Sequence, residues 1–346
     1  MSHSVDKLRQ RTDKFRIEMT SLENEFDVAI IGGGPGALAA ALWCGDLGLT
    51  SVLIERSGQL GGQLRKIYNP VLNYPGIETS NGSELADLMI AQAERRSGAE
   101  IRTGEVSGIT EGENGVRIEL SGGGRIESRA AIIATGVSRR KSGIPGEVDF
   151  LGRGILESGA KAGSEVTGLA VAIIGGGDAA IENAAILGRF ARKVYVIHRR
   201  DQFSARRELI EAAAALDNVE FVFDATASRI AGDEQLRSLE IKIAGSDEVR
   251  QLDIDRLLIR IGVEPNSGPF DNITKTPDGY IVTDVVGRTD LERVFAIGDV
   301  VNHTAPTIAG AVGQAATAVK AIYRQLAGDQ PANNGPNRSQ DQLTRP

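Results

Sequence analysis

The sequence predicts an α/β protein that contains two Rossmann-like, three-layer domains, each suited to binding a dinucleotide. Two glycine-rich turns carry this prediction, Gly32-Gly-Gly34-Pro-Gly-Ala37 and Gly175-Gly-Gly177-Asp-Ala-Ala180. Each turn follows a short apolar run typical of a buried parallel strand and opens into an alanine-rich stretch typical of a helix. With 346 residues, the chain is long enough for two domains that each bury a core.

The glycine turns have a physical role in dinucleotide binding. The first glycine allows the tight turn, the second lets the backbone approach the pyrophosphate, and the third small residue lets the helix pack closely on the strand. The N-terminus of the helix then presents backbone amides and a partial positive charge to the phosphates. One such motif alone also fits an ordinary turn between a strand and a helix, but two copies with matching downstream residues favour two nucleotide-binding domains.

The residue that follows each turn at a fixed distance distinguishes the two nucleotides. Glu55 stands 23 residues after Gly32, and His198 stands 23 residues after Gly175. A carboxylate at this place accepts hydrogen bonds from unmodified ribose hydroxyls, which favours FAD in the first domain. His198 is followed by two arginines, and such a basic cluster pairs with the 2′-phosphate of NADPH.

Composition and charge exclude several other classes of protein. The formal net charge of −7 argues against a general nucleic-acid binder. Residues 1–25 are polar and mixed in charge, unlike a secretory signal, and the apolar stretch from Val28 to Trp43 is interrupted by glycines and Pro35, unlike a membrane span. The single cysteine, Cys44, excludes an internal disulfide and a cysteine-based metal cluster. We therefore expect a metal-free protein of the reducing cytoplasm, with no membrane or nucleic-acid partner.

The order of the predicted elements divides the chain into segments. The first half ends in a buried strand that runs into Thr135-Gly136, and the second half ends in a strand that runs into Gly262. The chain then returns to the first domain through Gly298-Asp299 and a helix from about Ala309. The predicted segments are an N-terminal extension (1–25), the first domain (26–145 and 263–326), the second domain (146–262) and a disordered tail (327–346) rich in Asn, Gln, Pro and Gly.

The motifs and their order resemble those of the low-molecular-weight thioredoxin reductases and of the ferredoxin–NADP reductases that share their fold. The resemblance covers roughly residues 26–325 and rests on Gly32-Gly-Gly-Pro, Gly61-Gly-Gln-Leu64, Asn73-Tyr-Pro-Gly76, Ala134-Thr-Gly136, Gly152-Arg-Gly154, His198-Arg-Arg-Asp201 and Gly298-Asp299. It implies an FAD domain interrupted by an inserted NADPH domain, two-strand hinges near residues 140–150 and 262–266, and a homodimer.

The resemblance also implies which residues contact each cofactor. Glu55 would hold the adenosine ribose of FAD, and Asp299 the ribityl chain, while Gln63 and Asn73 would lie on the flavin side. The full set expected at FAD is Gly32, Gly34, Pro35, Gly36, Ala37, Glu55, Arg56, Gly62, Gln63, Leu64, Tyr68, Asn73, Thr135, Gly136, Gly298, Asp299, Thr307 and Ile308. The set expected at NADPH is Gly175, Gly177, Asp178, Ala179, His198, Arg199, Arg200 and Arg206. The related families carry another arginine at the position of Ser204, and either Arg206 or Arg207 would replace it from the next turn.

The chain departs from the thioredoxin reductases where those enzymes carry their redox motif. They have Cys-Ala-Thr-Cys-Asp four residues after Gly-Arg-Gly, whereas here Ser158 and Lys161 take the cysteine positions and Ala162 takes that of the acid. Pro306-Thr-Ile308 likewise replaces the family's Arg-Gln-Ala beside the flavin. Neither serine nor lysine accepts two electrons as a dithiol does, so disulfide reduction by this relay is excluded.

Tyr68 provides a point of resemblance to the ferredoxin–NADP reductases rather than to the thioredoxin reductases. In the ferredoxin–NADP reductases of this fold, an aromatic residue four places after Gly-Gly-Gln-Leu stacks on the flavin, and Tyr68 stands there. The alternative is an ordinary, partly buried tyrosine. Those reductases also have a C-terminal extension with an aromatic residue or histidine over the other flavin face, and the tail here has neither. Cys44 and His303 are interpreted as structural residues.

The sequence thus predicts an NADPH-dependent FAD oxidoreductase of the ferredoxin/flavodoxin–NADP reductase type, without a dithiol relay. Hydride would pass to the flavin and single electrons would leave toward an acidic carrier. Arg65, Lys66, Lys161 and the run Arg139-Arg-Lys141 would form the basic docking surface, unless they are ordinary solvated charges. The alternatives are a reductase that uses the flavin directly on a disulfide, quinone or other small molecule, and a non-catalytic FAD-binding redox sensor.

Overall fold

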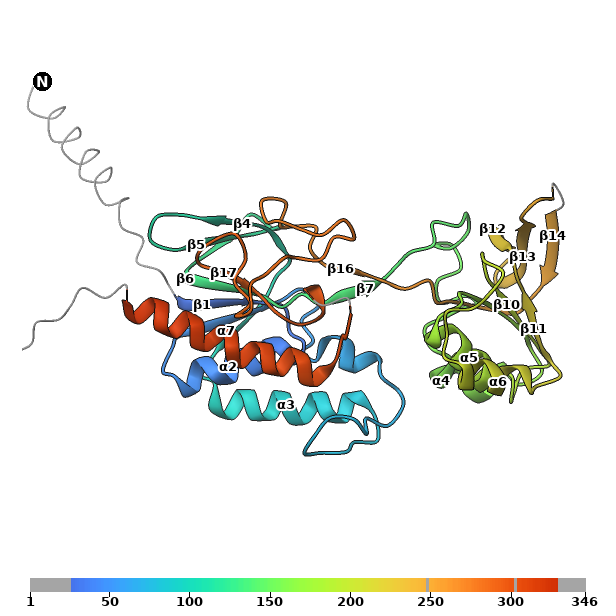
Figure 1. The fold of residues 1–346 in the computed structure, drawn as a ribbon, viewed down its shortest axis with the longest axis horizontal. Helices are drawn as coiled ribbons and strands as arrows, with labels where there is room; N and C mark the ends of the chain where they lie inside the picture. The colour runs from blue at the N-terminus through green and yellow to red at the C-terminus, as the bar shows by residue number, and fades with distance from the viewer. Residues whose placement is uncertain (1–25, 247–248, 302–303, 329–346) are drawn as a thin grey trace, which may run out of the picture. The chain divides into compact units, whose positions relative to one another are not determined.

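The structure, a computed structural model, describes residues 26–246, 249–301 and 304–328 (Figure 1). The predicted N-terminal extension, His303 and nearly all of the predicted tail lie outside these residues. The chain divides into two compact units. Among the described residues, the first comprises 26–62, Asp87–Thr135, 267–301 and 304–328, and the second comprises Gln63–Ala86, 136–246 and 249–266.

The first unit is built on a seven-stranded mixed sheet with the order β3-β2-β1-β6-β5-β4, and β17 also pairs with β6. The pairs that involve β1, β2, β3 and β17 are parallel, and those that involve β4 and β5 are antiparallel. The strands are β1 (Phe26–Ile31), β2 (Ser51–Glu55), β3 (Glu100–Thr103), β4 (Val106–Glu111), β5 (Val116–Leu120), β6 (Arg125–Ile133) and β17 (Val294–Ala296).

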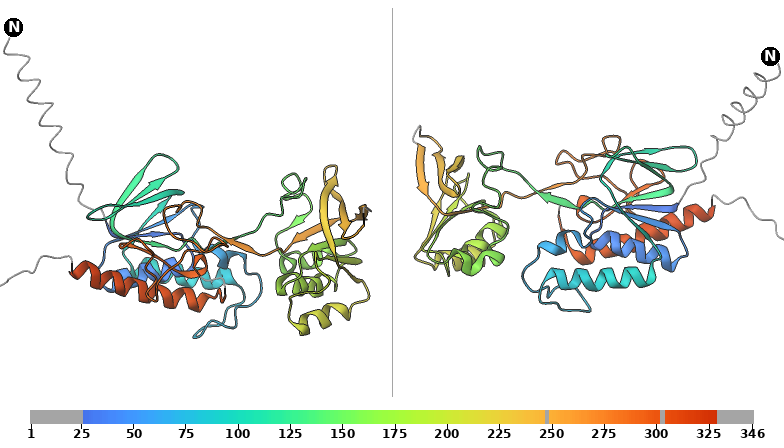
Figure 2. Two further views of the ribbon diagram at one scale, coloured as in Figure 1. Left: turned by 45° about the horizontal axis from the view of Figure 1, so that its top comes forward. Right: turned by 180° about the vertical axis from the view of Figure 1, so that it is seen from behind.

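Helices cover one face of this sheet (Figures 1 and 2). They are α2 (Pro35–Asp46), the later part of α3 (Gly82–Arg96) and α7 (Ile308–Gly328). The 3-10 helix η3 (Gly298–Val300) also belongs to this unit, and η1 (Gly62–Lys66) begins at its last residue before the second unit. On the other face, Ile54 and Ile133 belong to one buried cluster with Ile109 of β4 and Ile118 of β5. Because alternate residues of a strand point to opposite faces, a strand buried on both faces reads as a continuous apolar run.

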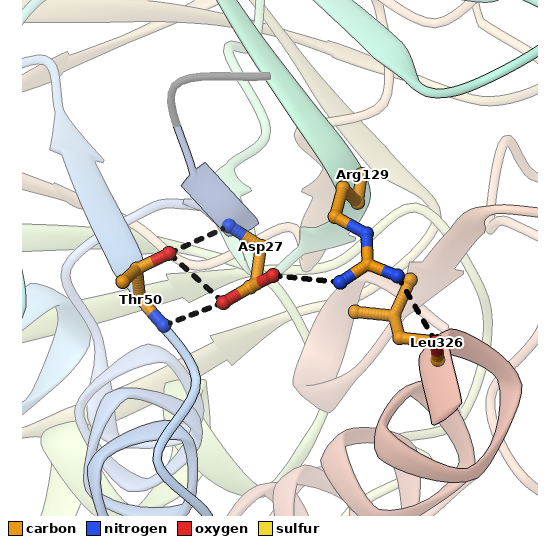
Figure 3. A network of polar contacts seen from close by, with 4 residues as sticks. All are labelled: Asp27, Thr50, Arg129 and Leu326. Atoms are coloured by element: carbon orange, nitrogen blue, oxygen red, sulfur yellow. Dashed lines mark hydrogen bonds and ion pairs between the residues drawn. The ribbon is translucent and has the colours of Figure 1, made fainter. Parts of the chain in front are cut away.

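A polar network joins the amino end of β1 to the C-terminus of α7 (Figure 3). The carboxylate of Asp27 accepts hydrogen bonds from the backbone amide and the hydroxyl of Thr50, each 2.9 Å long. Arg129 of β6 donates to Asp27 at 3.0 Å and to the carbonyl oxygen of Leu326 at 3.0 Å. Burial by itself raises the pKa of Asp27, but the bonds from Thr50 and Arg129 outweigh it and lower that pKa below its ordinary value. The carboxylate is therefore charged at neutral pH and holds the last turn of α7.

The second unit contains a five-stranded parallel sheet in the order β11-β10-β9-β15-β8 and a separate antiparallel sheet in the order β12-β13-β14. The parallel strands are β8 (Ile155–Leu156), β9 (Ala170–Ile174), β10 (Lys193–Ile197), β11 (Val219–Val222) and β15 (Arg256–Ile259). The antiparallel strands are β12 (Ala225–Gly232), β13 (Leu236–Ile243) and β14 (Val249–Asp253). The helices are α4 (Gly159–Ala162), α5 (Asp178–Leu187) and α6 (Arg207–Ala214), with the 3-10 helix η2 (Gly163–Val166).

Strand β9 shows how these elements form three layers. Val171 and Ile173 belong to the buried cluster that contains Ile181 of α5, on the helical face of the parallel sheet. Ala172, which points the other way, belongs to the cluster that contains Leu239 of β13. The predicted three-layer α/β arrangement is therefore present in this unit, and the antiparallel sheet is its third layer.

A short two-stranded sheet lies where the chain enters and leaves the large segment of the second unit. Its strands are β7 (Val137–Arg139) and β16 (Val263–Pro265), paired antiparallel. Strand β16 lies within the segment 262–266 and β7 lies just before the segment 140–150, and the role of these two segments as hinges stays a prediction. The chain turns there because Ser142 and Gly143 donate their backbone amides to the carboxylate of Glu147, at 3.0 and 2.9 Å.

We predict that Gly175→Ala lowers the melting temperature by about 2–12 °C, because it forces a side chain into a strained backbone conformation that costs about 1–3 kcal/mol. Gly175 has φ +145°, and a Cβ there would collide with the backbone of Arg260. Gly177→Ala is the control, since Gly177 has φ −93° and a Cβ there would meet only the Ser204 hydroxyl at 3.9 Å. Thermal unfolding without added nucleotide measures both, and equal melting temperatures for the two variants would contradict the prediction.

Candidate dinucleotide-binding sites

The first glycine turn lies at the carboxyl end of β1, against the adjacent strand β6. Gly32 has φ +115°, and a Cβ there would collide with the backbone oxygen of Ala134, the residue after β6. Gly34 is the N-cap of α2, Pro35 follows at its first position, and no atom lies within 4 Å of a Cβ on Gly34. A Cβ on Gly36 would instead lie in contact with Ala311 of α7, at 3.5 Å. The turn therefore leaves open backbone amides at a helix N-terminus, which fits the pyrophosphate of FAD.

Glu55 is fixed beside this turn at the end of β2. Its Oε1 accepts hydrogen bonds from the backbone amide of Ser57 at 2.9 Å and from the Ser57 hydroxyl at 2.7 Å. Its Oε2 lies 2.9 Å from the position that a Cβ on Gly33 would occupy. Arg56 is exposed. A carboxylate oriented toward the turn in this way fits an acceptor for ribose hydroxyls, as the sequence predicts.

The N-terminus of α7 lies in the same part of the first unit. Thr307 precedes the helix, and its hydroxyl accepts a hydrogen bond from the backbone amide of Gly310 at 3.0 Å. Gly298 donates its backbone amide to Gln314 at 2.6 Å, and a Cβ on Gly298, like one on Gly36, would lie 3.5 Å from Ala311. Burial raises the pKa of Asp299. Thr307, Ile308, Gly298 and Asp299 are thus brought near the first glycine turn, as a shared FAD site requires.

The segment after Gly62 places the other predicted flavin residues in the second unit. Leu64 is buried, and Gln63 donates to the carbonyl oxygen of Val137 at 2.6 Å. Asn73 is exposed. Tyr68 has 37% of its surface exposed, and the ammonium of Lys161 lies over its ring, 5.6 Å from the ring centroid. The contact of Tyr68 in this structure is therefore a cation–π pair, and its stacking on a flavin stays a prediction. Thr135 and Gly136 follow β6.

The second glycine turn repeats the first at the carboxyl end of β9. Gly175 lies against Arg260, the residue after β15, and Gly177 is the N-cap of α5. The loop that follows β10 folds over this turn, because Ser204 donates its backbone amide to Gly176 at 2.9 Å. Arg199 and Arg200 lie in that loop and are exposed. They are available to a 2′-phosphate at the end of β10.

His198 lies differently from the expectation that it contacts the phosphate. It is only 6% exposed, and a Cβ on Gly176 would collide with its ring. Its Nε2 is buried without a hydrogen-bond partner, and Phe203 packs on it with ring centroids 5.4 Å apart. Burial, and then the charge of Arg200, lower the pKa of His198. His198 is therefore a neutral imidazole packed between the glycine turn and Phe203.

Arg206 and Asp178, both expected at NADPH, bind each other. Asp178 begins α5, and its carboxylate accepts the backbone amide of Arg206 at 2.8 Å and the Arg206 guanidinium at 2.8 Å. The hydrogen bond from the Arg206 backbone amide lowers the pKa of Asp178. Burial acts in the opposite direction, but the side-chain bond and the charge of Arg206 also lower this pKa. An anion of the protein itself therefore occupies the first turn of α5, beside Ala179, where the resemblance places the dinucleotide.

The positions of the missing redox motif line a polar cavity of about 380 Å³. Ser158 is the N-cap of α4, and Ala162 is buried at its end. Lys161 pairs with Glu157 at 2.8 Å across one helical turn. No sulfur lies in this cavity, whose lining is Gly152, Gly154, Ile155, Leu156, Glu157, Ser158, Lys161, Ala162, Glu165, Gln235 and Arg256.

Arg260 has no role in the sequence analysis, although it directly follows a central strand of the parallel sheet. Comparison of the two glycine turns reveals it, because the residue that Gly175 lies against is Arg260, whereas the residue that Gly32 lies against is Ala134.

In residues 26–246, 249–301 and 304–328, no group of three His, Cys, Asp or Glu side chains is placed to hold a metal ion. No helix in the same ranges is long and apolar enough to cross a membrane.

We predict that Cys44 does not react with a thiol reagent in the folded protein at pH 8–9. Its side chain on α2 is fully buried, and burial raises the pKa of the thiol to about 12. The thiolate fraction at pH 9 is then roughly one in a thousand. Ellman's reagent should detect one thiol only after denaturation, while the exposed control variant Ser121→Cys should show one thiol before it. Equal reaction rates for the two cysteines would contradict a core role for Cys44.

Comparison with known proteins agrees with this geometry. Residues 26–321 match the family model described as pyridine nucleotide-disulphide oxidoreductase. A thioredoxin reductase of Listeria monocytogenes is 36% identical over 82% of this chain and 88% of its own length, and one of Bacillus subtilis is 33% identical over 88% and 96%. The crystal structure of a Lactococcus lactis thioredoxin reductase is similar with a TM-score of 0.78 and 31% identity, covering 88% of this chain and all of that chain.

These similarities confirm the predicted fold class, a thioredoxin-reductase-like α/β fold with FAD and NADPH domains of the Rossmann type. They also confirm FAD and NADPH as the cofactors. The chain is a member of the pyridine nucleotide-disulphide oxidoreductase family.

Proposed function

We propose that this protein is an NADPH-dependent FAD oxidoreductase that passes electrons onward without a dithiol relay, as a ferredoxin/flavodoxin–NADP reductase does. The observation that carries the proposal is the content of the cavity at α4. Ser158 and Lys161 stand where the thioredoxin reductases have cysteines, and the single cysteine of the chain, Cys44, is buried in α2. No pair of thiols is available to accept two electrons from the flavin and form or break a disulfide.

The residues of each glycine turn supply binding and orientation. When bound, FAD supplies the redox chemistry, taking hydride from NADPH and releasing single electrons. Gly34 leaves room for the pyrophosphate, Glu55 accepts from the adenosine ribose, and the N-terminus of α7 faces the same site. Arg199 and Arg200 supply the positive charge for the 2′-phosphate, with His198 as a neutral support below them.

An acidic one-electron carrier is the proposed acceptor, and exposed basic residues support it. Lys66, Arg140 and Lys141 are exposed in the second unit. Arg139 has a different role, since it donates to the carbonyl oxygen of Glu157 at 2.8 Å, and Lys161 is paired with the Glu157 carboxylate.

We also propose a homodimer in the cytoplasm. A reductase that uses the flavin directly on a disulfide or quinone is the second candidate, since the cavity at α4 is large enough for a small molecule. A redox sensor that binds FAD without catalysis is the third.

The unaltered protein should use NADPH with a higher kcat/KM than NADH. Replacing Arg199 or Arg200 by Ser should raise the Kd for NADPH by about ten- to a hundredfold, since a hydrogen bond to a charged group contributes about 1.5–3 kcal/mol. The Kd for NADH, which has no 2′-phosphate, should hardly change. Arg189→Ser, at an exposed position beyond α5, is the matched control. Equal efficiency with both nucleotides in the unaltered protein would rule out the assigned preference.

Reduction of ferredoxin should slow as salt rises, because complementary charge mainly accelerates association and is screened by ions. Arg140→Ser/Lys141→Ser should slow it further at low salt, while Arg125→Ser/Arg324→Ser, which removes two exposed charges of the first unit, should not. Reduction of a neutral quinone should respond much less, and thioredoxin should not be reduced. If ferredoxin and quinone rates fall equally, or ferredoxin accepts no electrons, the flavin-direct reductase replaces the carrier assignment. A yellow protein that NADPH does not reduce would indicate the redox sensor.

A further inference from the structure

Two arginines of the second unit converge on one uncharged oxygen atom. Arg139 donates to the carbonyl oxygen of Glu157 at 2.8 Å, and Arg260 donates to the same atom at 2.7 Å. Arg260 also donates to the carbonyl oxygen of Ile259 at 2.8 Å. The nearby carboxylate of Glu157 is paired with Lys161 instead. In the ranges that the structure describes, no ion pair joins a carboxylate to Arg139 or Arg260.

The two positive charges disfavour each other in this arrangement. Burial, and then the charge of Arg139, together lower the pKa of Arg260 to about 10. Burial also lowers the pKa of Arg139, and the electrostatic effects of Tyr68 and of the Glu157 carboxylate offset this only in part. Both guanidiniums are still protonated at neutral pH. A carbonyl dipole compensates two full charges only in part, so an anion would bind favourably between them.

The arginine pair lies at the edge of the parallel sheet where ligands bind in this class of fold. Glu157 follows β8, Arg260 follows β15, and Gly175 follows β9, so all three stand at the carboxyl ends of neighbouring parallel strands. In open α/β sheets, ligands bind outside the carboxyl ends of the strands. Adjacent strands are about 4.8 Å apart, so the Arg260 backbone is one strand away from the glycine turn. A Cβ on Gly175 would collide with the Arg260 carbonyl, which shows that the two segments are in direct contact.

The strand order fixes the direction in which a dinucleotide crosses this edge. The arginines assigned to the adenosine 2′-phosphate, Arg199 and Arg200, follow β10, on one side of β9. The glycine turn after β9 takes the pyrophosphate. The nicotinamide half must then extend to the other side of β9, over the end of β15, which is where Arg260 lies.

The N-terminus of α5 is less favourable to a phosphate than that of α2, because its first turn contains an acidic residue. The first turn of α5 is the usual anchor for the phosphates, but it carries the Asp178 carboxylate, whose charge is matched only by Arg206. An additional anion at this helix N-terminus therefore gains less than at an uncharged one. The first glycine turn, which has Pro35 at the same place and no acidic residue in the first turn of α2, has Ala134 where the second has Arg260.

We propose that Arg260 binds the nicotinamide-side phosphate of the dinucleotide, together with Arg139, which donates to the same carbonyl oxygen in this structure. The proposal rests on the proposed function only in that the second unit binds a nicotinamide dinucleotide. The phosphate takes the place of the Glu157 carbonyl as the acceptor for the guanidiniums. NADPH and NADH share this phosphate, so the pair contributes equally to both. This separates Arg139 and Arg260 from Arg199 and Arg200, which distinguish the two nucleotides.

Isothermal titration of the purified flavoprotein with NADP⁺, NAD⁺ and adenosine 2′,5′-bisphosphate tests the assignment. The last probe has the 2′-phosphate but no nicotinamide-side phosphate. Arg260→Gln should raise the Kd of NADP⁺ and of NAD⁺ by about ten- to a hundredfold and leave the bisphosphate unchanged. Arg139→Gln/Arg260→Gln should raise both further. Arg189→Gln, at an exposed position beyond α5, is the matched control and should change none of the three.

Two results would overturn the proposal. One is an unchanged Kd for NADP⁺ in Arg260→Gln with an unchanged melting temperature, and the other is an equal loss for the bisphosphate and NADP⁺. Failure of the proposed function would look different. If the unaltered protein binds NADP⁺ and NAD⁺ equally, the NADPH preference is wrong, and NAD⁺ still reports on Arg260. If it binds neither dinucleotide, both assignments fall.

Discussion

Both units depend on the close approach of a glycine turn to the backbone of the neighbouring strand. Gly32 lies against the carbonyl of Ala134, and Gly175 lies against the carbonyl of Arg260. Each glycine has a positive φ that other residues rarely adopt, and neither place has room for a Cβ. Because the turn lies this close to the next strand, the following helix begins directly above the carboxyl edge of the sheet. The helix N-termini, the ribose-side residues and the open space for a phosphate all take their positions from this contact.

The first unit also needs its opposite end to be fixed. Asp27 and Arg129 hold the last turn of α7 at the amino end of β1, while the first turn of the same helix lies beside Gly298 and Gly36. A 21-residue helix thus connects a structural ion pair to the cofactor site. The pair is partly buried and satisfied on both sides, so it contributes more than an exposed surface pair would.

In the second unit, the function of each charge depends on its existing partner. Arg206 is matched by Asp178 and Lys161 by Glu157, so neither is a vacant phosphate ligand. Arg199 and Arg200 are exposed at the end of β10, and Arg139 and Arg260 have only backbone carbonyls as acceptors. The count of basic residues near the glycine turn is therefore a poor guide to nucleotide affinity. As proposed, the 2′-phosphate and the nicotinamide-side phosphate therefore bind to different pairs of arginines.

The sequence by itself determined the features that depend on local chemistry. Gly32 and Gly175 require glycine because of their backbone conformation, the apolar runs before them form buried parallel strands, and Glu55 follows at the spacing of one strand–helix–strand unit. The absence of a dithiol also follows from the sequence, since one cysteine cannot form a disulfide within the chain. Only the tertiary structure decided the direction and partner of each polar side chain. His198 is buried, Arg206 binds Asp178, and Arg260 meets Arg139, which lies 121 positions earlier in the sequence. Such contacts depend on which strand ends lie side by side in the sheet, and no local pattern in the sequence specifies that order.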